Sequence, residues 1–311
     1  MKIVDSLVCP ACKNDLVRHH DKFGCSNERC IHSKHEYFYV CMDGIPVLIS
    51  ELACDTVFSS SQTKPMVVRS GDGGILRWLK RHIVGESSVT KKNIAQFIRA
   101  LPKGAKKPRV LIIGSGEIGS GTSGLYSSDI ELVGTDIYLS PYVNFVADSH
   151  YLPFKNETFD GVVIQAVLEH VVDPPLVVSE IHRVLKADGF VYAETPFMQQ
   201  VHEGAYDFTR YTVLGHRYLF KNFDRLDTGG LDGVGVALAW SLRSFIHAVT
   251  RSRLAAKLIF VPLRYFLALA EKIADPRSLH DANSGSYFLG KKSEKTIVHK
   301  ELIKEYQGFQ S

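Results

Sequence analysis

The sequence predicts an α/β fold built on a mostly parallel sheet, with a small cysteine-rich unit ahead of it. Apolar runs rich in β-branched residues, such as residues 110–113 and 159–164, are typical of buried parallel strands. Residues 89–101 carry apolar side chains at helical spacing and predict the amphipathic helix before the first strand. With 311 residues and 45% hydrophobic content, the chain is long enough to bury a large core.

The strands are expected in a fixed order along the chain. Five apolar runs predict parallel strands, at residues 110–113, 132–135, 144–147, 159–164 and 190–194. A helix is expected at 176–185, and the alternating residues 285–290 predict a late strand inserted antiparallel. These six strands predict a Rossmann-like, mostly parallel sheet, a fold that has seven strands and binds its ligand at the carboxyl ends of the central ones.

A glycine-rich turn follows the first expected strand. Its candidate cofactor-binding residues are Gly114, Ser115, Gly116 and Gly119. Glycine permits positive φ and lets the backbone approach a ligand closely. We expect a helix to begin after the turn, where its N-terminus would favour a ligand carboxylate. Dinucleotide-binding domains carry similar glycines, so the turn by itself leaves an NAD(P) oxidoreductase open.

Polar residues at the ends of the next strands extend this site. Asp136, followed by Ile137, is placed to accept hydrogen bonds from a ribose diol. Asp148 is expected to accept from an adenine amino group, with the Ser149 amide nearby. The alternative for Asp148 is an acid in a surface turn. Gln165 lies just beyond the fourth strand.

The order of these features resembles that of the type-11 class I methyltransferases. The shared motifs are Ala147-Asp148, Leu152-Pro153-Phe154, Phe159-Asp160 and Leu168-Glu169-His170, followed by Asp173-Pro174. The resemblance implies an S-adenosylmethionine site in which Gln165 faces the methionine moiety. It favours a methyltransferase over an oxidoreductase.

Four cysteines near the N-terminus predict a structural zinc site. Cys9 and Cys12 lie in a CxxC turn, and Cys25 and Cys30 follow after a further stretch. Zinc takes four ligands at tetrahedral corners, and two such pairs supply them. The alternatives to Cys30 as the fourth ligand are His32 and His35.

The N-terminal segment also resembles a known zinc-ribbon family. Its Cys-Pro-x-Cys start and its Asp-Gly-Ile-Pro-Val-Leu finish at residues 43–48 are similar to the family that includes the small activator of tRNA and protein methyltransferases. The resemblance implies a structural metal and a docking surface for a protein partner. We therefore expect a zinc-ribbon-like domain at 1–52, a linker with a basic helix at 53–87, a methyltransferase domain at 88–292 and a tail at 293–311.

Charge and hydropathy indicate the setting of the protein. The net charge of +4 is too small to demand nucleic acid as partner, although residues 75–109 hold ten Lys or Arg against a single acid. The N-terminus has no signal-peptide core, and no run of about 18 uncharged apolar residues occurs. A cytoplasmic location is expected, where paired cysteines favour metal over disulfide.

The densest group of reactive side chains follows the fifth expected strand. It includes His202, Asp207 and Arg210, and His170 lies in the turn after the fourth strand. An alcohol acceptor loses its proton at or after attack and needs a base, which makes His202 and His170 candidates. Two plainer interpretations stay open: a local ion pair between Asp207 and Arg210, and a capping or solvent-facing role for Glu169 and His170.

Residues 202–212 and 284–292 resemble bacterial methyltransferases associated with surface glycans and lipopolysaccharide. The resemblance implies His202 or His170 as the base, Arg210 as a clamp for an anionic group, and a sugar or lipid-linked glycan as the O-methylated acceptor. An RNA base methyltransferase is the alternative, because the chain is also similar to bacterial ribosomal-RNA guanine methyltransferases with a zinc knuckle. A non-catalytic, cofactor-binding partner subunit is the third.

Residues 234–275 form an apolar and basic insertion. Five Lys or Arg and no acid occur between residues 233 and 270. Lys257, Arg264 and Glu271, at intervals of seven, predict one polar stripe on an apolar helix kinked near Pro262. Such a helix is usually buried against the sheet or in a dimer. The alternative is an interfacial segment resting on the anionic inner face of a membrane.

Overall fold

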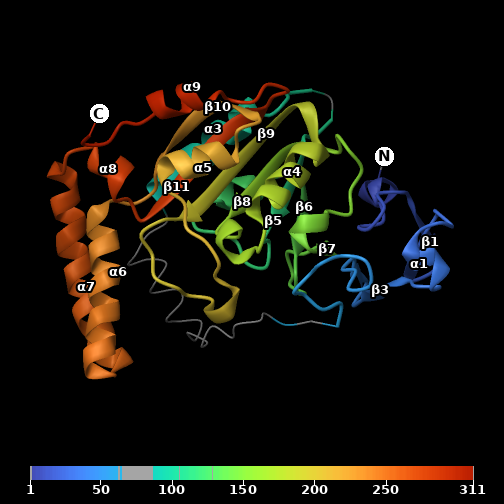
Figure 1. The fold of residues 1–311 in the computed structure, drawn as a ribbon, viewed down its shortest axis with the longest axis horizontal. Helices are drawn as coiled ribbons and strands as arrows, with labels where there is room; N and C mark the ends of the chain where they lie inside the picture. Colours follow the sequence, from blue (N-terminus) through green and yellow to red (C-terminus); the bar gives the residue numbers. More distant parts are fainter. Residues whose placement is uncertain (1, 62–63, 65–86, 105, 128, 311) are drawn as a thin grey trace. The chain divides into compact units, whose positions relative to one another are not determined.

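The computed structural model describes residues 2–61, 64, 87–104, 106–127 and 129–310. The chain forms two compact units, one of Met1–Gln165 with Asp173–Val191 and the other of Ala166–Val172 with Tyr192–Ser311. The first unit carries the cysteine-rich segment and the parallel strands, and the second carries the late strands and a long helical pair (Figure 1). The basic helix expected at 75–84 lies outside the described residues.

A seven-stranded sheet confirms the predicted fold class. Its strand order is β10-β11-β9-β8-β5-β6-β7. The strands are β5 (Arg109–Ile113), β6 (Glu131–Asp136), β7 (Phe145–Val146), β8 (Phe159–Gln165), β9 (Leu185–Pro196), β10 (Phe223–Gly230) and β11 (Gly285–Lys292). The pairs β5–β6, β5–β8 and β6–β7 are parallel, whereas β10 and β11 are antiparallel. Because β5, β6 and β8 end side by side, the residues that follow them lie at one edge of the sheet.

Two strands differ from the prediction. β9 begins at Leu185, immediately after the preceding helix, whereas the sequence predicted a start at residue 190. β10 was not located by its sequence, because Asp224, Arg225 and Asp227 interrupt any apolar pattern. It is the outermost strand of the sheet, where charged side chains are tolerated and discourage pairing with another chain.

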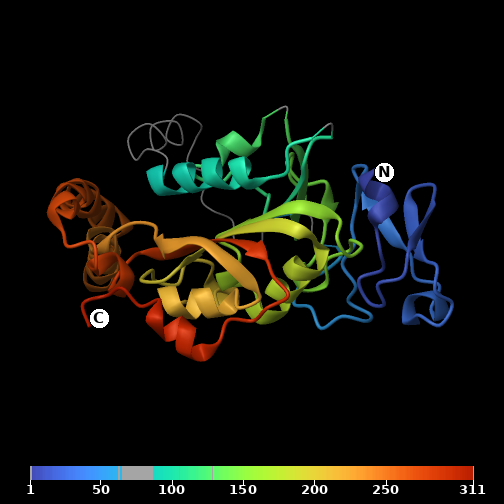
Figure 2. The same ribbon diagram turned by 90° about the horizontal axis from the view of Figure 1, so that it is seen from above.

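Two helices of the first unit, α3 (Ser88–Ala100) and α4 (Pro174–Val184), cover opposite faces of the sheet (Figures 1 and 2). The Ser87 side chain caps α3, and the Asp173 side chain caps α4 by accepting from the Leu176 amide at 3.0 Å. Gly161 in β8 lets α3 approach closely, since a Cβ there would lie 2.6 Å from the Phe97 ring. The predicted helices at 89–101 and 176–185 are confirmed.

The helix expected after the glycine turn is not formed. Among the described residues between β5 and β6, the helical element is the 3₁₀ turn η2 (Ser123–Leu125). Glycines at 119, 121 and 124 weaken helix formation here, and Gly121 adopts a φ of +78°. The prediction of a helix N-terminus at this site is therefore wrong.

The cysteine-rich segment is part of the first unit. It forms η1 (Ile3–Ser6), β1 (Leu16–His19), β2 (Lys22–Cys25), α1 (Ile31–Lys34), β3 (Tyr39–Met42) and β4 (Ile45–Pro46), with the strands in one antiparallel sheet. Backbone hydrogen bonds join it to the rest of the unit. The Val8 amide donates to Pro153 O at 2.9 Å, and the Leu48 amide donates to Val146 O in β7 at 2.7 Å. The segment that follows β4 therefore runs beside β7, the edge strand of the larger sheet.

In the second unit, two long helices lie side by side (Figures 1 and 2). These are α6 (Val234–Thr250) and α7 (Arg253–Ala270), which continues through Pro262 and is followed by η6 (Glu271–Ile273). Glu271 Oε1 accepts from the Val236 amide at 3.0 Å, which joins the start of α6 to the end of α7. Leu258 and Phe266 are 66% and 69% exposed. Within the described chain, this face of α7 is not buried against the sheet.

Shorter helices complete the described chain. They are η3 (Ser149–Tyr151) in the first unit, and η4 (Leu168–His170), η5 (Gly204–Tyr206), α5 (Val213–Leu219), α8 (Ser278–Asp281) and α9 (His299–Lys304) in the second. The expected C-terminal tail thus contains the helix α9. No described helix is long and apolar enough to cross a lipid bilayer.

Candidate functional site

The glycine turn and the end of β6 form the centre of the predicted cofactor site. The amides of Gly114 and Ser115 donate to Thr135 O at 2.9 and 3.0 Å, which ties the turn to β6. Gly114 has a φ of +80°. The Gly116 amide donates to Asp136 Oδ2 at 2.7 Å, so the carboxylate lies against the turn as the sequence predicted. The Ile137 amide donates to Asp136 Oδ1 at 2.7 Å.

Two of the glycines are needed for close approach. A Cβ on Gly116 would collide with the Tyr138 hydroxyl and lie 2.9 Å from Asp136 Oδ2. A Cβ on Gly119 would overlap Gln165 Oε1 at the end of β8. The structure therefore brings the predicted residues of three strand ends together within the first unit. At positions 116 and 119 of the turn, any residue other than glycine would displace its neighbours.

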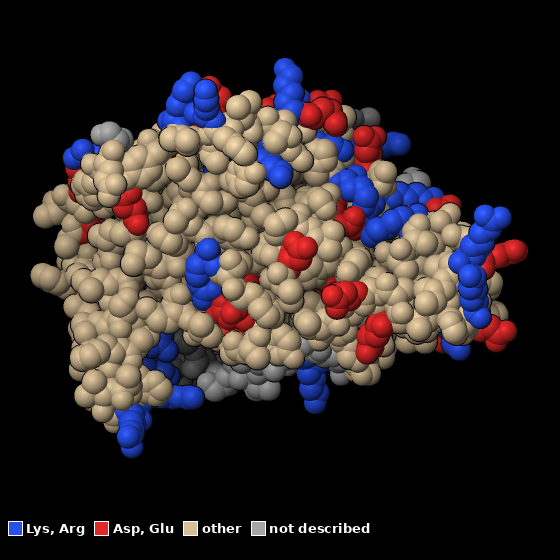
Figure 3. All heavy atoms as spheres, viewed as in Figure 1, with Lys and Arg blue, Asp and Glu red and all other residues tan. Residues whose placement is uncertain are grey.

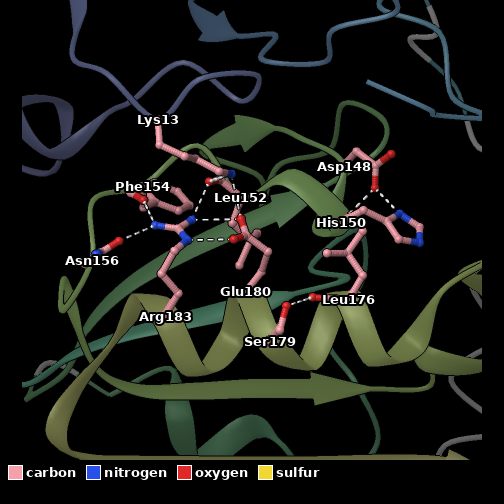
Figure 4. A network of polar contacts seen from close by, with 10 residues as sticks. All are labelled: Lys13, Asp148, His150, Leu152, Phe154, Asn156, Leu176, Ser179, Glu180 and Arg183. Atoms are coloured by element: carbon pink, nitrogen blue, oxygen red, sulfur yellow. Dashed lines mark hydrogen bonds and ion pairs between the residues drawn. The ribbon is translucent and has the colours of Figure 1, made fainter. Parts of the chain in front are cut away.

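Asp148, predicted to face adenine, is buried with 3% of its surface exposed. Its Oδ1 accepts from the His150 amide at 2.9 Å and lies 2.6 Å from His150 Nδ1. The Asp173 amide donates to His150 Nε2, which leaves the ring proton on Nδ1, directed at Asp148 (Figure 4). The surface-turn interpretation of Asp148 is wrong. Ser149 is also buried, in the turn η3.

A residue outside the predicted set completes the surroundings of Asp148. Thr56 Oγ1 donates to Asp148 Oδ2 at 2.5 Å. A carboxylate has about four acceptor positions, so these three donors leave room for one more, such as an adenine amino group. Nothing in the sequence indicated Thr56, because it lies in the segment expected to be a linker.

A partly buried ionic network centred on Glu180 joins the ribbon to α4 (Figure 4). Glu180 accepts from Lys13 Nζ at 2.7 Å and from Arg183 at 2.6 and 2.8 Å. Lys13 and Arg183 also donate to Leu152 O, and Arg183 donates to Phe154 O. Burial alone would raise the pKa of Glu180, but the Arg183 hydrogen bonds and the Lys13 charge outweigh it and lower that pKa.

The four predicted zinc ligands lie together. The sulfur atoms of Cys9, Cys12, Cys25 and Cys30 are all within 4.8 Å of one another. Cys9 Sγ lies 3.9 Å from Cys30 Sγ, and Cys12 Sγ lies 3.4 Å from Cys25 Sγ. Sulfurs bound to a tetrahedral zinc at about 2.3 Å are separated by about 3.8 Å, so this cluster fits the ion.

His32 lies beside the cysteine cluster rather than in it. Its Nδ1 is 3.6 Å from Cys9 Sγ and 3.5 Å from Cys30 Sγ. Its Nε2 is 2.6 Å from Ser50 Oγ. The arrangement supports Cys30 as the fourth ligand and gives His32 the position of a neighbouring imidazole that contacts the ligand sulfurs.

The predicted catalytic residues meet in the second unit. His202 Nδ1 lies 3.2 Å from Asp207 Oδ2, and its Nε2 lies 3.9 Å from Glu169 Oε1. His170 Nε2 lies 3.6 Å from Glu169 Oε1, and the two imidazoles cross at 74° with centroids 4.8 Å apart. Glu169 and His170 follow β8, and His202 and Asp207 follow β9, so two consecutive strand ends supply the cluster.

Glu169 differs most from its sequence interpretation. It is 0% exposed, and neither carboxylate oxygen has a hydrogen-bond partner. The solvent-facing alternative is therefore wrong for this residue. Burial raises the pKa of Glu169 to about 8, against the lowering effect of the Arg210 charge. Burial also lowers the pKa of His170, whose Nδ1 is 2.7 Å from Tyr206 O.

Arg210 is committed to local contacts. Nη1 and Nη2 donate to the two Asp207 oxygens, Nη1 also donates to Thr209 O, Nε to Gln199 O and Nη2 to Gln200 O. These five contacts use all five N–H groups of the guanidinium. In this structure Arg210 thus forms the local ion pair with Asp207 and has no donor left with which to clamp an anionic ligand.

A comparison with protein families identifies part of the chain. Residues 113–193 match a family model described as a methyltransferase domain. The matched stretch is a little over a quarter of the chain. It begins at the end of β5 and includes the glycine turn, Asp136, Asp148, Gln165 and the turn that carries Glu169 and His170.

Curated relatives match over a short segment. The chain is 49% identical over 55 residues to the mitochondrial arginine-hydroxylase NDUFAF5 of Mus musculus, and 47% identical over 49 residues to that of Homo sapiens. The matches cover 18% and 16% of this chain, and only 15% and 14% of the length of those relatives.

Solved structures of similar fold include several methyltransferases. Phosphoethanolamine N-methyltransferase 2 of Haemonchus contortus, in complex with S-adenosyl-L-methionine, is 15% identical and has a TM-score of 0.43; the match covers 73% of this chain and 59% of that one. A SAM-dependent methyltransferase from Archaeoglobus fulgidus is 18% identical with a TM-score of 0.41, covering 70% and 99%. A complex of a putative methyltransferase with the Trm112 activator from Haloferax volcanii is 14% identical with a TM-score of 0.41, and the match covers 70% of this chain and 93% of that one.

Proposed function

We propose that this protein is an S-adenosylmethionine-dependent methyltransferase. The observation that carries the proposal is the contact of the Gly116 amide with Asp136, in the same glycine turn whose Gly119 lies against Gln165 and within the residues that match the methyltransferase family model. We expect the methionine end of the cofactor to lie against the glycine turn, Asp136 to face the ribose, and Asp148 to use its remaining acceptor position for adenine.

In methyl transfer the protein mainly aligns the acceptor with the cofactor and removes one proton from the acceptor. The cofactor supplies an activated methyl group and its leaving group, and the acceptor oxygen attacks in line. We propose that His202 is the base that accepts the proton of the acceptor hydroxyl. Its Nδ1 faces the Asp207 carboxylate, and its Nε2 points toward Glu169. Asp207 is in turn held by Arg210, which makes Arg210 a positioning residue.

The acceptor we favour is a hydroxyl of a sugar or of a lipid-linked glycan intermediate. A membrane-bound acceptor accords with the helical pair α6–α7. Between residues 233 and 270 there are five Lys or Arg and no acid, and Leu258, Phe266 and Leu269 are each more than 60% exposed. Figure 3 shows basic side chains at the lower end of this pair and an uncharged face along it.

We propose that the α6–α7 pair rests on an anionic lipid surface. Exposed apolar side chains enter the headgroup region while neighbouring cations meet the lipid phosphates. The protein would then act in the cytoplasm at the inner membrane face. The alternative is that a second copy of the chain covers the same apolar face. Vesicle binding together with a measurement of the mass in solution distinguishes lipid binding from such a dimer.

The cysteine cluster is proposed to hold a structural zinc ion and to take no part in transfer. Its ribbon already contacts the chain's own β7 and α4, so we infer that its docking surface serves this chain first. A zinc-knuckle RNA methyltransferase remains the alternative, and a non-catalytic partner subunit the third.

Calorimetric titration of the full chain with S-adenosylhomocysteine and with NAD tests the cofactor assignment. We expect saturable binding of S-adenosylhomocysteine and none of NAD, and the reverse result would overturn the proposal. Transfer of a labelled methyl group from S-adenosylmethionine to fractionated cell extract then tests the acceptor. Label in the glycolipid fraction supports the glycan, label in RNA supports the first alternative, and cofactor binding without any transfer supports the second.

A further inference from the structure

The cluster of Glu169, His170 and His202 has an unusual hydrogen-bonding state. Both Glu169 oxygens and His170 Nε2 are buried and have no hydrogen-bond partner. A buried polar group without a partner costs free energy, and a charged one costs more than a neutral one. Three ligand atoms, one carboxylate oxygen and two imidazole nitrogens, lie within 4.8 Å of one another here.

Each imidazole is oriented so that Nε2 can bind a ligand. His170 Nδ1 is 2.7 Å from Tyr206 O, an oxygen that can only accept, so Nδ1 carries the proton and Nε2 has a free lone pair. His202 Nδ1 lies 3.2 Å from the Asp207 carboxylate, which favours the same tautomer. A carbonyl or carboxylate behind the second ring nitrogen is the usual support of a histidine that binds metal.

The distances suit a shared cation better than direct hydrogen bonds. Glu169 Oε1 lies 3.6 Å from His170 Nε2 and 3.9 Å from His202 Nε2, both too long for a hydrogen bond. Ligands bound at about 2.0–2.2 Å to one ion are separated by about 3.0–3.5 Å. Each of the two distances from Glu169 Oε1 exceeds that range by only a few tenths of an ångström, and the three ligand atoms all lie within 4.8 Å of one another.

We propose that Glu169, His170 and His202 form a binding site for a divalent first-row transition-metal ion, separate from the cysteine cluster. Two imidazoles and one carboxylate are the donor set that such ions take with open positions for further ligands. The carboxylate charge, the neutral imidazoles and the burial of Glu169 together favour a doubly charged ion over a monovalent one. All three ligands lie in the second unit, so the site needs no residue of the cofactor site.

The site also refines the proposed function. An ion with open positions binds an acceptor oxygen and lowers the pKa of its hydroxyl, so that the ion, rather than a free imidazole, makes the proton easy to lose. In that state His202 is a metal ligand. This refinement rests on the proposed methyltransferase activity, whereas the metal site itself does not.

The test uses the full chain with zinc bound and excess metal removed, titrated with Co²⁺. We expect one equivalent to bind and to produce visible d–d absorption without a thiolate charge-transfer band, which separates this site from the cysteines. Glu169→Gln, which keeps the side-chain shape, and His170→Ala should each weaken binding at least tenfold. His280→Ala, a half-buried histidine of the same unit, should leave it unchanged.

Two results would overturn the metal site: no Co²⁺ binding up to millimolar concentration, or equal binding by the wild type and the Glu169→Gln/His170→Ala double variant. Thermal melts of each variant establish that it folds, and Glu169→Gln serves if His170→Ala does not. Intact S-adenosylhomocysteine binding in a protein that binds no Co²⁺ would sink the metal site alone. Loss of S-adenosylhomocysteine binding in the metal-loaded wild type would sink the proposed function alone.

Discussion

Thr56 donates a 2.5 Å hydrogen bond to the buried carboxylate of Asp148. Thr56 follows the zinc ribbon, and Asp148 follows β7 in the predicted adenine region. The segment that leaves the ribbon therefore helps to set the orientation of a cofactor acid. The connection gives the ribbon a route of influence on cofactor binding that does not require a catalytic residue of its own.

Replacing Thr56 with valine should weaken S-adenosylhomocysteine binding about five-fold. Valine keeps the shape but removes the donor to Asp148 and the acceptor of the Phe58 amide, and one such hydrogen bond contributes about 1 kcal/mol. Thr56→Ser retains the hydroxyl and should restore the affinity. Calorimetry of the three proteins decides the matter, and equal dissociation constants would remove Thr56 from the site.

Gly116→Ala should abolish measurable cofactor binding, or weaken it at least tenfold, with little loss of stability. The new methyl group would displace the Tyr138 side chain and press on Asp136, disturbing the hydrogen bond that defines the ribose end. Gly104→Ala is the matched control, since a Cβ there meets nothing within 4 Å. A Gly116→Ala protein with wild-type affinity would show that the turn does not contact the cofactor.

Cys12→Ser should remove one equivalent of bound zinc and unfold the ribbon. A structural zinc contributes much of the folding free energy of so small a unit, so the melting temperature should fall by about 10 °C or more. Metal analysis and hydrogen exchange of residues 9–48 measure the two effects. Cys41→Ser, outside the cluster, is the control, and unchanged zinc content in Cys12→Ser would contradict the assignment.

Glu180→Gln should destabilise the first unit by about 2 kcal/mol, because it leaves Lys13 and Arg183 with a neutral partner in a partly buried network. The folded pKa of Glu180 is below its ordinary value of 4.5, so its contribution is present above that pH and lost as the pH falls through the folded pKa. Denaturant unfolding of wild type and variant at pH 7 and at pH 3 should show the difference shrinking in acid. The exposed pair of Lys304 and Glu301 supplies a control, with less than about 1 kcal/mol for Glu301→Gln.

Phe266→Ser with Leu269→Ser should reduce flotation with anionic vesicles several-fold while neutral vesicles bind weakly throughout. The pair removes exposed apolar area from α7 without touching its cations. Val298→Ser, an exposed apolar residue outside the helical pair, should have no effect. Equal flotation of all variants, or a dimer by light scattering that the double variant disrupts, would argue against lipid as the occupant.

The sequence by itself determined the order of the core strands and the grouping of four cysteines into one cluster. Buried parallel strands such as β5 and β8 are continuous apolar runs, and the glycines and acids at strand ends recur at fixed positions, so local pattern sufficed for Gly116, Asp136 and Gln165. The edge strand β10 and the missing helix after the glycine turn were not predicted. Charged residues conceal an edge strand, and a helix in that position depends on more than the turn that precedes it.

Tertiary structure alone decided which polar groups meet and how deeply each is buried. Thr56 and Asp148 are 92 residues apart, and Lys13 and Glu180 are 167 apart, separations over which no periodicity carries information. The sequence also did not predict that Glu169 would be completely buried beside two imidazoles. Burial and hydrogen-bond satisfaction are properties of the packed chain, and they make Glu169 the centre of the proposed metal site.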